Sequence, residues 1–99
     1  MGVLQTDKRN QMTRSELEQL TECGHDLAAK VALAIIAAAQ VGPCDMEVEV
    51  TMGTLGLIER TLGMFAKKGE PYLWKNCDRY EITLSFMEVD AVIYARVNR

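Results

Sequence analysis

Apolar residues recur at helical spacing over residues 14–41 and predict one long helix there. At its start, Thr13 and Glu16 fit a capping box, in which two side chains satisfy free backbone amides, and Gly42 and Pro43 supply a stop. The large apolar residues fall on two neighbouring faces of this helix, with alanines filling the gaps: Leu17, Leu20, Leu27, Val31 and Ile35 on one, Leu33 and Ile36 on the other.

The length of this helix, and the apolar residues around most of its surface, predict a contact with a second chain. At 1.5 Å per residue it would span roughly 42 Å, whereas a domain of this size has a diameter of about 33 Å. Two explanations accommodate the excess length of the helix: it kinks near Gly24, or its excess length packs on another copy of the chain. We expect a homo-oligomer, in its simplest form a dimer, with Leu33, Ile36 and Ala37 in the contact. The alternative is a central helix wrapped by its own domain.

The middle of the chain predicts a strand followed by a second helix. Residues 45–51 read DMEVEVT, in which apolar and acidic positions alternate as in a half-buried strand. Residues 54–68 carry apolar residues along one helical face, with Lys67 and Lys68 in the last turn, where the helix dipole favours cations. Gly69 and Pro71 then end the helix.

The last third of the chain predicts a loop and two strands. Residues 69–79 are loop-like, and from Tyr80 to Phe86 apolar and polar positions alternate. The tail fits either a helix capped by Ser85 and Glu88 or a strand rich in branched residues, and we favour the strand.

These segments predict an α+β fold of order α-β-α-β-β, with two helices packed on one face of a mostly antiparallel sheet. Residues 13–99 are expected to form this single domain, preceded by a flexible N-terminal arm at residues 1–12.

Composition narrows the class of protein. Hydrophobic residues at 48% and charged residues at 25% are ordinary globular values. A net charge of −3 argues against general nucleic-acid binding, which needs basic residues to neutralise phosphates. Only nine apolar residues lie between Lys30 and Gln40, too few for a membrane span of about 20. Three scattered cysteines and a polar start favour reduced thiols and a cytoplasmic location.

The outward face of the predicted sheet is the first candidate site. Alternation places Glu47, Glu49 and Glu81 on its solvent side, joined by Glu88 or Asp90 if the third strand pairs there. Such an acidic patch can dock a basic protein partner, whereas the plainer interpretation is a solvated sheet face. No ligand spacing supports a metal site.

The loop at residues 69–79 is the second candidate, because cations and aromatic residues alternate around it. Phosphate neutralisation and a stacking plane are what a nucleotide or other anionic ligand needs. The ligand-binding residues in this interpretation are Arg60, Lys67, Lys68, Trp74, Lys75 and Arg79. Tyr72 and Trp74 fit somewhat better as anchors for a protein partner, and a lone Trp is also common as a lid over a core.

Two further motifs are weak. The turn TMGTLG, residues 51–56, precedes a helix N-terminus that can hold an anion, but it lacks the remaining residues of a phosphate-binding loop. Cys23, His25 and Asp26 lie close in sequence without the repeated spacing of a zinc site, so we expect Cys23 to be a buried, inert thiol.

The leading hypothesis is therefore a small intracellular, non-enzymatic protein-interaction module that acts as a homo-oligomer. The regulators and inhibitors that phages and mobile elements encode are an example of such a role. Its predicted partner-binding residues are Glu47, Glu49, Glu81, Tyr72 and Trp74. The alternative is the anion-binding domain described above. An enzyme ranks third, because one histidine without an activating partner offers little chemistry, and we expect no cofactor.

Overall fold

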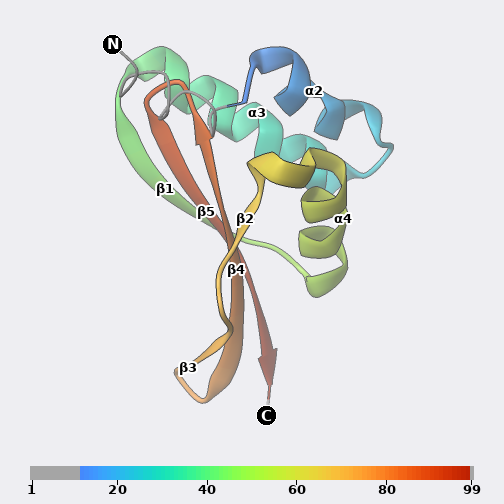
Figure 1. Ribbon diagram of the computed structural model, residues 1–99, viewed down its shortest axis with the longest axis vertical. Coiled ribbons are helices and arrows are strands. Elements are labelled where there is room, and N and C mark those ends of the chain that lie inside the picture. Colours follow the sequence, from blue (N-terminus) through green and yellow to red (C-terminus); the bar gives the residue numbers. More distant parts are fainter. Residues whose placement is uncertain (1–11, 99) are drawn as a thin grey trace.

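A computed structural model describes residues 12–98, which form a small α+β domain of three helices and a five-stranded mixed sheet (Figure 1). The helices are α2 (Arg14–Glu22), α3 (Asp26–Val41) and α4 (Met52–Leu62), the last followed by a short 3-10 turn at Gly63–Phe65. The strands are β1 (Cys44–Glu49), β2 (Lys67–Lys68), β3 (Tyr72–Trp74), β4 (Cys77–Phe86) and β5 (Val89–Asn98).

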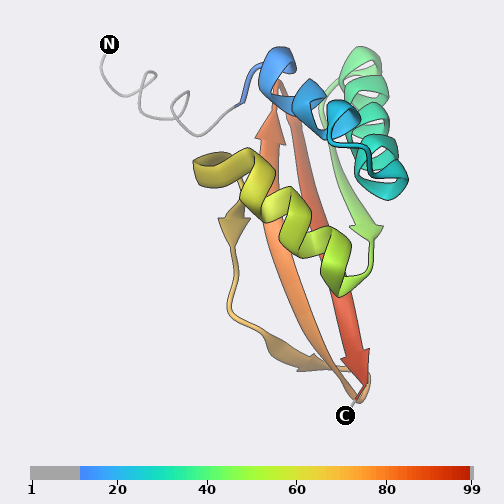
Figure 2. The same ribbon diagram turned by 90° about the vertical axis from the view of Figure 1, so that its right-hand side faces the viewer.

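The two ten-residue strands β4 and β5 form the centre of the sheet. The strand order is β1-β5-β4-β2, and β3 also pairs with β4. β1 runs parallel to β5, and the other pairings among residues 12–98 are antiparallel. The helices lie over one face of this sheet (Figure 2), where Ile93 of β5 is flanked in register by Val48 and Ile82. The largest fully buried side chains include Leu17, Leu20, Ile35, Ile58, Ile82, Leu84 and Ile93.

The prediction of one helix over residues 14–41 is wrong, because the chain breaks at Gly24. This glycine has φ 77°, a left-handed conformation that side-chain-bearing residues rarely adopt. His25 then caps the next helix, where its Nδ1 accepts a hydrogen bond from the amide of Ala28 at 3.5 Å. The sixteen residues of α3 span about 24 Å, so the length argument for a second chain no longer applies. In the part of the chain that the structure describes, no helix is long and apolar enough to cross a membrane.

Alanine at Gly24 and at Gly53 should change stability in opposite directions. At Gly24 a side chain meets no neighbour within 4 Å, so Gly24→Ala acts through backbone strain alone and should cost about 1 kcal/mol. Gly53 lies inside α4 with ordinary helical φ, and Gly53→Ala should add about 0.5 kcal/mol. Urea unfolding of both variants measures the two shifts, and equal signs would contradict the explanation given for the helix break.

The predicted second helix and the predicted loop also differ from the structure. α4 ends at Leu62 because Gly63 adopts φ 56°, and Lys67 and Lys68 therefore belong to β2 and not to a helix end. Within the predicted loop, residues 72–74 form β3, which turns directly into β4. Lys75 and Asn76 make this turn with φ 51° and 66°, as in the tight two-residue loops of hairpins. The tail is the predicted strand, β5.

The predicted arm, residues 1–12, lies outside the described residues except for Met12. This residue is buried against the core, and its amide donates a hydrogen bond to the carbonyl oxygen of Ser85 at 3.2 Å. Met12 therefore ties the start of α2 to the end of β4.

Candidate functional site

The sheet face turned away from the helices is the candidate site, and we call it the open face. Because side chains alternate across a strand, the residues opposite the core positions of β4 and β5 point to this face. The register of β1 and β3 adds their alternate residues to it. The open face thereby brings together all five residues of the predicted partner-binding set: Glu47, Glu49, Tyr72, Trp74 and Glu81.

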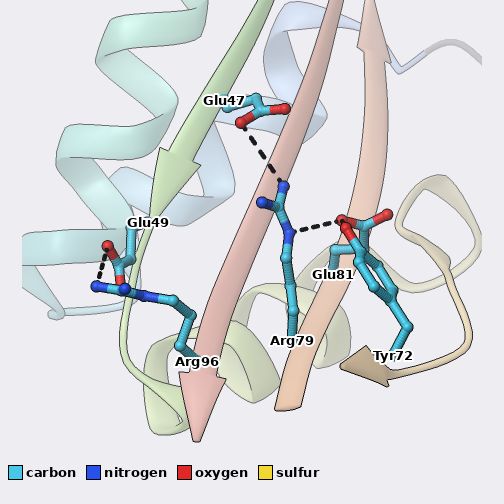
Figure 3. Close-up of polar contacts among 6 residues, drawn as sticks. All are labelled: Glu47, Glu49, Tyr72, Arg79, Glu81 and Arg96. Atoms are coloured by element: carbon cyan, nitrogen blue, oxygen red, sulfur yellow. Dashed lines mark hydrogen bonds and ion pairs between the residues drawn. The ribbon is translucent and has the colours of Figure 1, made fainter. Parts of the chain in front are cut away.

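Arg79 of β4 occupies the middle of the open face and is almost fully enclosed, with 5% of its side chain exposed. Its Nε donates a hydrogen bond to Oε2 of Glu81 at 3.0 Å. Its Nη2 lies 3.6 Å from Oε1 of Glu47 on β1 (Figure 3). The guanidinium therefore links strands β1 and β4 across β5, and its charge is met by two carboxylates within the protein.

Three aromatic rings enclose the same guanidinium. Its Cζ lies 3.8 Å from the ring centroid of Tyr94, 4.8 Å from that of Trp74 and 6.0 Å from that of Tyr72. Trp74 and Tyr94 also meet edge to face, with centroids 6.0 Å apart. These distances suit cation–π attraction, which strengthens where water is excluded. We call Arg79, Tyr72, Trp74 and Tyr94 the arginine–aromatic cluster.

A second ion pair lies beside this cluster, between β5 and β1. Arg96 donates from Nε and Nη2 to the two carboxylate oxygens of Glu49, at 2.6 and 3.1 Å. The hydrogen bond and the negative charge of Glu49 raise the pKa of Arg96. The predicted acidic patch is thus largely neutralised by two arginines, and Glu47, with 63% of its side chain exposed, is the most accessible of its three glutamates.

The hydroxyl of Tyr72 should titrate at higher pH than a free tyrosine. Partial removal from water raises the pKa of Tyr72, Arg79 lowers it, and Glu81, which accepts its hydrogen bond at 3.2 Å, raises it. Because the folded-state pKa lies above the unfolded value, this group contributes stability below its ordinary pKa and loses it as the pH rises through the folded pKa. An absorbance titration should show the raised value, which Glu81→Gln lowers; Tyr72→Phe identifies the transition. An unchanged titration in Glu81→Gln would contradict this account.

The structure does not gather the predicted ligand-binding set in one place. Arg60 lies on α4, over the opposite face of the sheet. Lys67 and Lys68 are successive residues of β2 and point to opposite faces. Trp74, Lys75 and Arg79 do lie together, with Nζ of Lys75 4.7 Å from the Trp74 ring. Of the two cations beside Trp74, Lys75 is exposed and Arg79 is buried.

The two weaker motifs serve as helix boundaries. Cys23 is exposed, contrary to prediction, because α2 ends at Glu22 and the thiol only donates to the carbonyl oxygen of Leu20. In the turn at residues 51–56, Oγ1 of Thr51 accepts the amide of Thr54 at 3.2 Å and caps α4. Across residues 12–98, no group of three His, Cys, Asp or Glu side chains is arranged to hold a metal ion.

The predicted oligomer contact is divided between surface and core. Leu33 is 57% exposed and Ala37 is also exposed, so both lie on the outer surface of α3. Ile36, at 8% exposed, belongs to the hydrophobic core. The outer surface of α3 also exposes Leu27 and Val41.

Sequence reasoning missed Tyr94 and Arg96 as members of the site. Both alternate with the buried Ile93 and Ala95, and period-two alternation within the predicted strand would have placed them on the open face. The pairing of β1 with β5, which brings Glu49 next to Tyr94 in register, has no comparable mark in the sequence.

No family model matches this chain, and neither the curated proteins nor the solved structures include a significant match to it.

Proposed function

We propose that this chain is a non-enzymatic protein-interaction module that docks another protein through the open face and regulates or inhibits it. The observation that carries the proposal is the arginine–aromatic cluster, in which Arg79 is held by two carboxylates and three rings. We place the module in the cytoplasm, where its thiols stay reduced.

The composition and order of the cluster support docking. Tyr, Trp and Arg are the residue types most enriched among those that dominate binding energy at protein interfaces. Tyr72 is 43% exposed, and Trp74 is half-buried, so part of each ring is available to a partner. Because contacts within the chain already fix these rings, binding loses little side-chain entropy.

Capture by the immobilised chain tests the docking surface. A protein partner retained by the natural sequence should be lost, by roughly tenfold or more, from the double variant Tyr72→Ala with Trp74→Ala. Met52→Ala is the matched control, since Met52 is an exposed apolar residue on α4, which covers the other face of the sheet. Equal loss in both variants, or none in the double variant, would overturn the proposal.

A nucleotide or another anion is the second candidate ligand, because the exposed Lys75 places its Nζ 4.7 Å from the centroid of the half-buried Trp74 ring. A nucleotide that binds the folded chain raises its melting temperature. If a nucleotide panel raises it, and Lys75→Glu or Trp74→Ala abolishes the gain while Glu47→Lys does not, the ligand candidate replaces the protein partner.

We also propose that a second copy covers the outer surface of α3. Leu33, Ala37 and Val41 give this surface an apolar line with small residues that let a neighbouring helix approach. Sedimentation over a range of concentrations should show a dimer that Leu33→Lys dissociates. A monomer at every concentration would remove the dimer and leave the open face unaffected.

A further inference from the structure

The two edges of the sheet are built differently. One edge is made of β2 and β3, two and three residues long; both residues of β2 are lysines, and Pro71 lies between the two strands. Short strands, lysine and proline are the usual means by which proteins stop an edge from pairing with another strand. The other edge is β1, an unbroken strand of six residues at the end of the strand order.

Alternate backbone groups of β1 face away from the sheet. The amides of Cys44 and Val50 donate to Glu88 and Tyr94, at 3.2 and 2.7 Å. In a parallel pair, every second residue directs its amide and carbonyl groups to the neighbouring strand and the intervening residues direct theirs outward. The outward groups of β1 therefore belong to Asp45, Glu47 and Glu49, and they offer a hydrogen-bonding ladder to an added strand.

The side chains flanking this edge differ between the two faces. On the open face stand the carboxylates of β1, and Asp45, Glu47 and Asp90 line a hollow of about 310 Å³ beside the edge. On the helix side, the half-buried Met46 and Val48 lie next to the edge. In a strand added here, alternate side chains would lie beside the carboxylates on the open face, and the intervening side chains would lie beside Met46 and Val48 on the helix side.

The carboxylates of β1 influence which kind of strand can pair with its free edge. A second copy of β1 would bring like charges opposite one another, which is destabilising between paired strands. A strand carrying lysine or arginine at alternate positions would instead bring its cations to Asp45 and to Glu47, whose side chain stays 63% exposed although it meets Arg79. The exposed carboxylates of Asp45 and Glu47 therefore disfavour self-pairing and favour a basic segment, whereas Glu49 is already held at both oxygens by Arg96.

We propose that the free edge of β1 binds an extended segment of a partner protein in which basic and apolar residues alternate, so that the segment adds a strand to the sheet. This inference rests on the proposed function, because it names the chemistry of the protein partner. It places that segment at the edge, next to the open face that the rest of the partner covers.

Fluorescent capped peptides of six residues, the length of β1, test the edge against the full chain. Alternating lysine and valine should bind at least tenfold tighter than the same composition in two blocks, and than alternating glutamate and valine. Methylation of one alternate set of backbone nitrogens in the alternating peptide should abolish its binding and methylation of the other set should not, because only one set of amides faces β1. Bound peptide should slow hydrogen exchange at the amides of Asp45, Glu47 and Glu49.

Charge reversal locates the contact on the chain. Asp45→Lys should weaken binding of the alternating peptide about tenfold, and Glu22→Lys, an equal charge change at an exposed position on α2, should leave it unchanged. Glu47→Lys is a second test, with its fold checked because Glu47 also meets Arg79. Equal binding of the block peptide, unchanged binding of both methylated peptides, or no binding at all overturns the edge site. Loss of a captured partner in the Tyr72 and Trp74 double variant is scored separately and bears on the proposed function alone.

Discussion

Replacement of Arg79 by methionine should lower the free energy of unfolding by about 2–3 kcal/mol, and the melting temperature by about 10–20 °C. Methionine keeps much of the apolar bulk but removes the guanidinium that Glu47 and Glu81 share and that the Tyr94 ring covers. Breaking a buried pair typically costs 3–5 kcal/mol. We expect less here because both carboxylates reach water.

Arg14→Met provides the matched control for this prediction. Arg14 also pairs with a glutamate at 3.2 Å, but 61% of its side chain is exposed, and such surface pairs contribute well under 1 kcal/mol. Denaturant unfolding of both variants gives the comparison, and a double-mutant cycle of Arg79→Met with Glu81→Gln isolates the pair. Similar losses at Arg79 and Arg14 would mean that the arginine–aromatic cluster does not hold the sheet together.

Ile93→Ala should cost about 3–4 kcal/mol, the largest effect that we expect from a single substitution. Ile93 has no exposed surface and lies on the central strand β5, where its register partners Val48 and Ile82 are also apolar. Removing three carbon atoms there loses their burial and leaves a cavity that the flanking strands cannot close.

Val97→Ala is the control within the same strand. Val97 is 38% exposed near the end of β5, so its truncation should cost less than about 1 kcal/mol. Thermal and urea unfolding of the two variants measure the difference. Equal costs would show that β5 contributes similarly along its length, contrary to the burial that places the core around Ile93.

The strands were the most predictable part of the fold. Strict alternation in residues 45–50 and 80–86 predicted strands, because one face of each meets the helices and the other meets water. The same alternation correctly placed Glu47, Glu49 and Glu81 together on one face. Local periodicity is enough for such a prediction, since it does not depend on which strands become neighbours.

The sequence left a kink near Gly24 open only as an alternative and did not predict the hairpin at residues 72–86, because single backbone conformations decide both features. The helical spacing of apolar residues continues from Leu20 to Leu27, but Gly24 with its positive φ and His25 with an extended backbone separate α2 from α3. Lys75 and Asn76 likewise turn the chain with positive φ, although lysine rarely marks such a turn. Periodicity reports which residues are buried, and it reports these backbone conformations poorly.

The ion pairs across the open face also could not be predicted from the sequence. Glu47 meets Arg79 and Glu49 meets Arg96, each across more than thirty residues of chain. Such contacts follow from the strand order, in which β5 lies between β1 and β4. Sequence reasoning therefore found the acidic residues and missed that arginines neutralise them.

The position of β5 between two strands that precede it in the sequence has a consequence for biosynthesis. When β1 leaves the ribosome, the strand with which it pairs has not yet emerged, because β5 lies far downstream in the sequence. Helices form from local contacts, whereas this sheet has to wait for residues 89–98. A premature stop codon shortly before these residues would therefore leave β1 without a neighbour and the nascent chain open to degradation.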